Sequence, residues 1–304
     1  MLTIFSTPKP FCGHINVIQR NAIVSWKHLH PGCEVILFGP EEGARETALE
    51  LGIRHEPKVQ CNEYGTKYLA SFFDRAQQIA RHDVLCYVNC DIILTSDFRR
   101  AVEKFLNWPR PFLMAGQRWD LDVREPLEFT HADWEEQIRS HALDANNQRP
   151  PQWIDYFVFS RGLFLNRIPR FVIGRPSWDN WLIWYARHSG AAVIDASSVV
   201  TPIHQNHDYS YHPDGEEGVW QGDEARENQR LLGGRWHCRT LEDARYRLTP
   251  AGLQRNTYYW VLQGKRAIRA YSDDARFAML KVTRPFRRAL GLPRERFSGA
   301  LKKP

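Results

Sequence analysis

The chain has 304 residues, of which 43% are hydrophobic and 25% charged, so its composition excludes a disordered or fibrous protein. This length suits one large α/β domain, or one domain with a tail. No stretch approaches the roughly 20 apolar residues of a spanning helix, and the N-terminus lacks the pattern of a signal peptide. The six cysteines show no metal-binding spacing. We therefore expect reduced thiols in a cytoplasmic protein.

The net charge of +6 is distributed unevenly along the chain. From Arg235 onward there are 17 Lys and Arg against 5 Asp and Glu, whereas the residues before it hold 24 against 30. An acidic body argues against nucleic acid as a partner. The basic tail predicts contact with something anionic.

The first half of the chain alternates short apolar runs with helical patterns. Strands are predicted at 2–5, 35–38, 84–88, 112–115, 156–159 and 192–194, and helices at 15–29, 41–51, 69–80, 97–107 and 177–188. Such alternation indicates an α/β fold with a mainly parallel sheet flanked by helices, whose ligands bind beyond the carboxyl ends of the strands. We expect a globular domain over 1–245 and a basic, mostly helical C-terminal extension over 246–304.

The run VLCYVNCDIIL at 84–94 carries two polar residues, Asn89 and Asp91, inside an apolar strand pattern. Burying such groups without partners costs about 2–7 kcal/mol, so they end the strand at a cleft or cap the next element. Side chains two apart in a strand point the same way, so both could address one metal–diphosphate unit. A carboxylate with substrate phosphates commonly holds Mg²⁺ or Mn²⁺. The alternative is an Asp91 that only caps or turns the strand end.

Two further segments could bind an anion beside this position. TPKPF at 7–11 follows the first predicted strand and lies on the same rim of the sheet. GTK at 65–67 precedes a predicted helix, whose N-terminus attracts negative charge, and Lys67 adds a full positive charge there. A glycine turn followed by a solvated lysine is the alternative interpretation.

The segment IGRPSWDNWLIWYAR at 173–187 is typical of a helix start, with Ser177 as the expected cap. Asp179 falls in the first turn, where backbone donors and the helix dipole favour its ionised form. Trp178 and two further tryptophans could form an aromatic wall beside a sugar ring. An acid that merely complements the helix dipole is equally compatible with this segment.

The segment IHQNHDY at 203–209 places His204 and His207 three residues apart. Pro202 and the polar residues that follow predict a loop. One of the histidines could complete an oxygen-rich manganese site, although loop histidines are usually surface groups. A metal hydrolase built on these histidines and Asp208 would lack a convincing third ligand.

Together these segments resemble nucleotide-diphospho-sugar transferases of the GT-A type, in particular a bacterial and plant group of glycosyltransferase-like proteins. The resemblance covers roughly residues 1–245 and implies a Rossmann-like GT-A fold. The motifs that carry it are FSTPKPF, GTKYLASFFDRAQ, VLCYVNCDIIL, WIDYFVFSRGLF, IGRPSWDNWL and IDASSVVTPIHQNHDYSY.

The resemblance assigns roles to individual residues. Asn89-Cys90-Asp91 matches the Asp-x-Asp position that holds Mg²⁺ or Mn²⁺, with Asn in place of the first acid, which should weaken metal binding. Asp179 matches the general base of inverting members. The implied donor-binding residues are Thr7, Pro8, Lys9, Lys67, Asn89 and Asp91; the acceptor-binding residues are Asp155, Tyr156, Trp178 and Asn180; the metal ligands are Asp91 with His204 or His207.

The expected activity is metal-assisted transfer of a sugar from a nucleotide-diphospho-sugar to a glycan or lipid-linked acceptor hydroxyl. A non-catalytic scaffold of the same fold in a polysaccharide-assembly system is the alternative. The tail could reach the inner membrane face, or it could pack on its own domain or on a second subunit. The residues that suggest membrane contact are Phe277, Leu280, Phe286 and Leu290, among Arg284, Arg287 and Arg288.

Overall fold

The computed structural model describes residues 1–209, 213–265 and 268. The chain divides into two compact units, Met1–Asn256 and Thr257–Pro304. In the second unit residues 257–265 are helical, and the tail residues 277–290 expected to contact a membrane lie outside the described part. Within the described residues, no helix has the length and apolarity needed to cross a bilayer.

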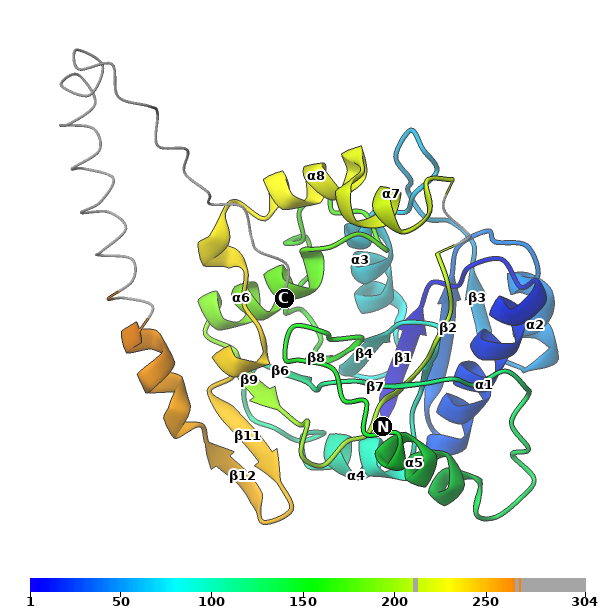
Figure 1. Ribbon diagram of the computed structural model, residues 1–304, viewed down its shortest axis with the longest axis horizontal. Helices are drawn as coiled ribbons and strands as arrows, with labels where there is room; N and C mark the ends of the chain where they lie inside the picture. The colour runs from blue at the N-terminus through cyan, green and yellow to red at the C-terminus, as the bar shows by residue number, and fades with distance from the viewer. Residues whose placement is uncertain (210–212, 266–267, 269–304) are drawn as a thin grey trace. The chain divides into compact units, whose positions relative to one another are not determined.

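A nine-stranded sheet forms the centre of the first unit (Figure 1), in the order β12-β11-β9-β6-β8-β4-β1-β2-β3. Its strands are β1 (Leu2–Ser6), β2 (Glu34–Phe38), β3 (Arg54–Glu56), β4 (Val84–Val88), β6 (Phe112–Ala115), β8 (Tyr156–Ser160), β9 (Ala192–Asp195), β11 (Tyr246–Thr249) and β12 (Gly252–Arg255). β8 runs antiparallel to β4 and β6, β12 runs antiparallel to β11, and the remaining neighbours are parallel. The predicted mainly parallel α/β sheet is confirmed.

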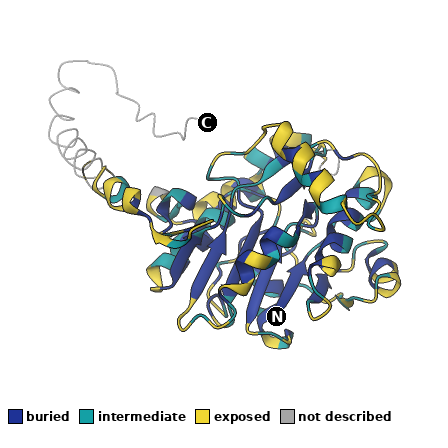
Figure 2. Cartoon of the chain, turned by 90° about the horizontal axis from the view of Figure 1, so that it is seen from below, coloured by how far each residue is buried: buried dark blue, intermediate teal, exposed yellow. Residues whose placement is uncertain are grey.

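Helices cover both faces of this sheet, and the alternation along each strand explains why. Phe5 and Tyr87 face one hydrophobic core with α3 (Leu69–Ile79) and α6 (Trp178–His188), whereas Ile4 and Cys86 face the other with α1 (Gly13–Leu29) and α4 (Ser96–Glu103). All residues of β4 are buried, so the strand reads as a continuous apolar run. Figure 2 shows the buried strands between helices whose outer faces are exposed. The helices are α1 (Gly13–Leu29), α2 (Ala44–Glu50), α3 (Leu69–Ile79), α4 (Ser96–Glu103), α5 (Trp134–Asp144), α6 (Trp178–His188), α7 (Gly215–Gln221) and α8 (Asp223–Leu231).

A second, three-stranded sheet was not predicted, and it positions the candidate site. It consists of β5 (Ile92–Ile93), β10 (Ile203–Gln205) and β7 (Trp119–Leu121), with α5 packed against it. β10 pairs antiparallel with β5, so His204 lies opposite Ile92. The first part of the segment expected to be a loop is therefore a strand.

The chain after residue 245 begins with a hairpin rather than with the expected helix. β11 continues the main sheet beside β9, and β12 folds back on β11. Leu248 is buried, and Gly252 has a φ of 111°, a conformation that glycine adopts without strain. The first compact unit thus extends to Asn256, beyond the boundary expected at residue 245.

Candidate active site

The chain leaves β4 through a tight turn at Asn89, Cys90 and Asp91. The amide of Ile92 donates to the Asn89 carbonyl at 3.1 Å, which closes the turn. The two polar side chains consequently have separate partners: Asn89 contacts Tyr87 and Asp155, whereas Asp91 contacts histidine. The expectation that both address one metal, drawn from strand geometry, is wrong because the strand has ended at Val88.

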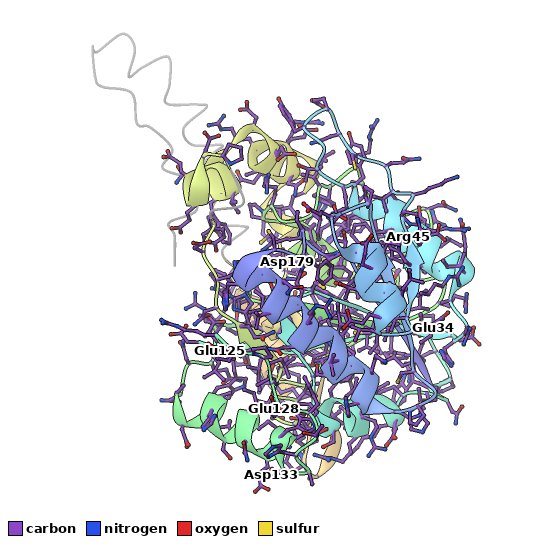
Figure 3. All side chains as sticks on the ribbon, turned by 90° about the vertical axis from the view of Figure 1, so that its right-hand side faces the viewer. Glu34, Arg45, Glu125, Glu128, Asp133 and Asp179 are labelled. Carbon is purple, nitrogen blue, oxygen red and sulfur yellow. The ribbon has the colours of Figure 1, made fainter. Side chains whose placement is uncertain are left out.

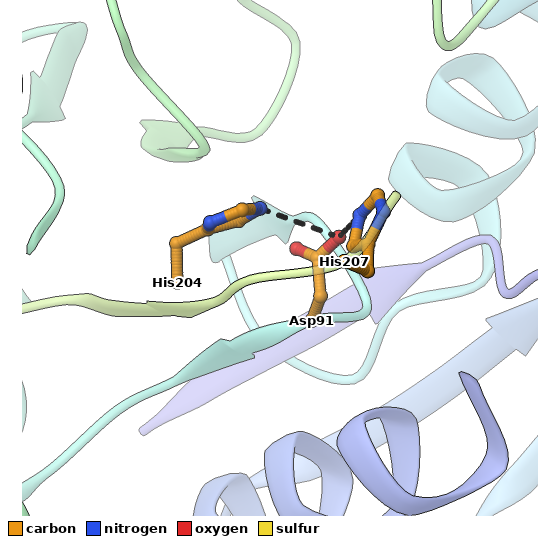
Figure 4. A group of neighbouring side chains, drawn as sticks. All are labelled: Asp91, His204 and His207. Carbon is orange, nitrogen blue, oxygen red and sulfur yellow. Dashed lines mark hydrogen bonds and ion pairs between the residues drawn. The ribbon is translucent and has the colours of Figure 1, made fainter. Parts of the chain in front are cut away.

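Asp91 lies between two imidazole rings, His204 on one side and His207 on the other (Figure 4). Its Oδ2 is 3.2 Å from His207 Nε2 and 4.0 Å from His204 Nε2. The ligand atoms of these three residues all lie within 4.8 Å of one another, and no other such group occurs in residues 1–209, 213–265 and 268. Tertiary structure thus brings together Asp91 and both candidate histidines.

The remaining nitrogen of each ring faces an oxygen acceptor. His207 Nδ1 is 2.7 Å from the carbonyl of Asp208, and His204 Nδ1 is 3.2 Å from Asp120 Oδ1. Oxygen acceptors there favour protons on the Nδ1 atoms, which leaves an Nε2 lone pair on each ring for a cation beside Asp91. Histidines that bind metals usually have this second partner.

The donor set fits a divalent cation. Asp91 Oδ1 is buried and has no hydrogen-bond partner among the residues that the structure describes, a costly state that a cation would relieve. One carboxylate with two imidazoles suits Mn²⁺ better than Mg²⁺, which prefers oxygen ligands alone. Asp208, considered as a ligand in the hydrolase hypothesis, is outside this group.

The charge of Asp91 is strongly stabilised. Burial acts to raise its pKa, but the contacts with His207 and His204 and the charge of Lys9 outweigh burial and hold the pKa well below its usual range. Asp91 is therefore ionised at neutral pH. The buried Gln205 amide donates to the Asp91 carbonyl at 3.1 Å and fixes the turn to β10.

Asn89 belongs to a polar network that runs behind the metal-ligand group. Asn89 Nδ2 donates to Asp155 Oδ1 at 2.6 Å, and Arg118 donates to Asp155 Oδ2 at 2.8 Å. Arg118 also pairs with Asp120 at 2.8 Å, and Asp120 contacts His204. The departure from the Asp-x-Asp pattern has a physical reason here: an acid at position 89 would meet the Asp155 carboxylate.

We expect Asn89→Asp to destabilise the fold without strengthening metal binding. Two carboxylates in contact lose the present hydrogen bond and repel each other, which should cost about 1–3 kcal/mol at pH 8 and less near pH 5, where one can bind a proton. Urea unfolding at both pH values measures the cost. A substantially tighter Mn²⁺ affinity in this variant would contradict the placement of Asn89.

Asp179 lies in the first turn of α6, half-buried, at the same edge of the sheet as Asp155. Burial raises its pKa to about 7, and the charge of Asp155 acts in the same direction, while backbone amides of 177, 179 and 180 oppose them. The expectation that backbone donors keep Asp179 fully ionised is wrong because burial outweighs them. In Figure 3, Asp179 is well separated from Glu34, which begins β2 at the other edge.

The N-cap of α6 differs from its predicted form. Ser177 makes no side-chain cap and has a φ of 89°, a left-handed conformation that is strained for serine. Such strain is often found near functional sites, because the surrounding structure must hold it in place. Here the unusual backbone delivers Asp179 to the helix start.

The loop after β1 and the segment before α3 lie against each other. The Lys67 ammonium pairs with Glu41 and donates to the Pro8 carbonyl at 3.3 Å, so it is not a solvated lysine. Thr7 Oγ1 is buried without a hydrogen-bond partner in the described structure. Lys9 reaches the metal-ligand group, where its Nζ is 3.1 Å from His207 Nε2. Direct contact of these residues with a donor stays a prediction.

Three of the four residues expected to bind the acceptor pack in the core or hydrogen-bond to the backbone. Tyr156 is fully buried, and Trp178 packs its ring against Tyr87 and Phe157 in the core, so neither faces an open surface. The Asn180 side chain donates to the Arg239 carbonyl. Asp155 alone lies in the polar network.

Three residues around the site were not predicted from the sequence: Arg118, Asp120 and Gln205. Arg118 and Asp120 follow the strand that ends at Ala115, and the rule that sites lie beyond strand ends could have identified them. Gln205 carries no comparable signal, because its role depends on the pairing of β10 with β5.

In fold, the chain is similar to nucleotide-diphospho-sugar transferases of the GT-A type. One is glucosyl-3-phosphoglycerate synthase from Mycobacterium tuberculosis with Mn²⁺, uridine diphosphate and phosphoglyceric acid: TM-score 0.45, 15% identity, 78% of each chain. Another is S. aureus TarS 1-349 with UDP: TM-score 0.48, 8% identity, 76% of this chain and 64% of that one. No protein-family model matches the sequence, and neither does any curated protein.

Proposed function

We propose that this chain transfers a sugar from a nucleotide-diphospho-sugar to an acceptor hydroxyl, with metal assistance and inversion at the anomeric carbon. The observation that carries the proposal is the group Asp91, His204 and His207, set at the carboxyl ends of parallel strands. The half-buried acid Asp179 has its pKa raised to about 7 at the same edge.

The donor half of the site would be held by the metal-ligand group. Asp91, His204 and His207 would bind Mn²⁺ or Mg²⁺, which when present neutralises charge on the departing nucleoside diphosphate. The neighbouring Lys9 supplies a cation on the loop after β1. Lys67, tied to Glu41, holds that loop and does not itself reach the diphosphate in this proposal.

The acceptor half would depend on Asp179. An acceptor hydroxyl becomes a competent nucleophile when a base accepts its proton as the new bond forms, which contributes about 10²–10⁴ in rate. A carboxylate with a pKa near the working pH is well matched to that task. Asp155 is held by Asn89 and Arg118, and its charge acts to raise the pKa of Asp179.

The pH dependence of transfer follows from this assignment. Below pH 7 Asp179 is mostly protonated and cannot act as a base, so the rate at saturating Mn²⁺ should rise about tenfold per pH unit up to 7 and then level off. Transfer measured from pH 5.5 to 8.5, with Mn²⁺ binding measured in parallel, separates this effect from histidine protonation. A flat profile would contradict the role of Asp179.

The first experiment is a screen of nucleotide sugars for thermal stabilisation with and without Mn²⁺, followed by donor hydrolysis and transfer assays on any stabilising compound. Mn²⁺-dependent stabilisation together with turnover supports a transferase. Stabilisation without turnover would favour the non-catalytic scaffold. Failure of every nucleotide sugar to stabilise the chain would reject both.

A further inference from the structure

A lysine ammonium already lies among the three metal-ligating side chains. Lys9 Nζ is 3.1 Å from His207 Nε2, and His207 Nε2 is in turn 3.2 Å from Asp91 Oδ2. Burial lowers the pKa of Lys9, and the negative charges of Asp91 and Asp208 oppose that shift. A positive charge thus lies beside the proposed cation site in the protein on its own.

The backbone of Lys9 is held at this position by the side chain of Gln19. The Gln19 side chain accepts from the Lys9 amide at 2.6 Å and donates to the Lys9 carbonyl at 2.9 Å. Gln19 is only 2% exposed, and prolines on both sides of Lys9 restrict the loop further. Only the four-carbon stem of Lys9 is left to move its ammonium.

Lys9 and a metal ion compete for the same electron pair. With its proton on Nδ1, facing the Asp208 carbonyl, His207 has a single lone pair, on Nε2. That lone pair can accept a hydrogen bond from Lys9 or bind a cation, but not both. A divalent ion at this site would also repel the neighbouring ammonium.

We propose that the Lys9 ammonium competes with the metal ion and keeps the metal affinity of the site low until the donor binds. The inference rests on the proposed function, since it assumes that Asp91 and the histidines bind the metal. In the free protein Lys9 holds His207 Nε2 and balances Asp91. When a nucleoside diphosphate enters, its oxygens become the acceptors for Lys9, which releases Nε2 to the metal.

Metal and nucleoside diphosphate then bind cooperatively. The diphosphate removes the competitor of the metal, and by linkage the metal must strengthen diphosphate binding by the same factor. Lys9 would therefore be a positioning residue: it sets the order and coupling of binding and does not take part in bond making. Its role predicts an unusual result, namely tighter metal binding after removal of a side chain from the site.

The test is Mn²⁺ binding to the full chain at a fixed pH of 8, followed by the electron paramagnetic resonance signal of free Mn²⁺. Lys9→Met keeps the aliphatic stem and removes the charge, so it should bind Mn²⁺ about tenfold or more tightly without nucleotide. UDP should raise Mn²⁺ affinity in the parent protein more than in the variant. Lys104→Met, an exposed lysine after α4, controls for the loss of one positive charge.

Two further variants make the outcome decisive. Asp91→Asn added to Lys9→Met should abolish the binding, which places the ion at this site. Lys9→Ala should change the affinity in the same direction as Lys9→Met, and thermal unfolding shows that each variant is folded. Unchanged or weaker Mn²⁺ binding in both Lys9 variants would overturn the role of Lys9 and leave the metal site standing. No Mn²⁺ binding by any protein would instead overturn the proposed site itself.

Discussion

Asp179→Asn should retain donor and Mn²⁺ binding and lose about 10²–10⁴ of the transfer rate. The amide has nearly the same shape as the carboxylic acid, but it cannot accept the proton of the acceptor hydroxyl. Transfer and donor-binding assays on the same preparation measure the two halves separately. Normal turnover in this variant would remove Asp179 from the role of base.

The stability of Asp179→Asn gives an independent check. The folded-state pKa of about 7 is above the ordinary 3.8, so between these values the folded protein binds more protons than the unfolded chain. Parental stability therefore falls as pH rises from about 4 to 7. Because Asp179 is half-buried, we expect the variant to be more stable by only about 1–3 kcal/mol at pH 8, with no difference near pH 4.

A matched control tests the alternative that Asp179 only complements a helix dipole. Glu136 is an exposed acid in the first turn of α5, one position further from the helix start than Asp179 is in α6. Glu136→Gln should leave transfer unchanged and alter stability by no more than about 1 kcal/mol. If both variants lost the same small amount of stability and neither lost transfer, the dipole interpretation of Asp179 would hold.

Asp91→Asn should weaken Mn²⁺ binding by about 100-fold or more and remove metal-dependent donor binding. The change replaces the one carboxylate of the metal-ligand group and leaves two neutral rings. Calorimetric titration with Mn²⁺, and then with donor, measures both effects. Stabilisation of the variant by donor and Mn²⁺ to the parental extent would exclude Asp91 as a ligand.

Asp83, at the opposite end of β4 from Asp91, provides the control for Asp91→Asn. Asp83 immediately precedes β4, its side chain is 94% exposed, and it pairs with Arg161. Asp83→Asn removes one negative charge from the protein without touching the ligand group. It should bind Mn²⁺ with parental affinity, so that a loss in Asp91→Asn alone reflects ligation and not net charge.

Most of the central sheet could be predicted from local sequence. β4 is buried on both faces and therefore reads as an unbroken apolar run, and the periodic apolar face of α3 carries an equally local signal. β10 could not be predicted in this way. It has three residues, and it is a strand only because Ile92–Ile93 and Trp119–Leu121 pair with it. The same holds for the hairpin of β11 and β12.

The sequence by itself determined the α/β class, the strand ends that carry polar residues, and the candidates Asp91, Asp179, His204 and His207. Only the tertiary structure decided which of them meet. It separated Asn89 from Asp91 by a turn, drew both histidines to Asp91 through β10, and buried Trp178 and Tyr156 in the core. The reason is physical: residue type and spacing report the local backbone, whereas ligation, pKa and burial depend on neighbours that are distant along the chain.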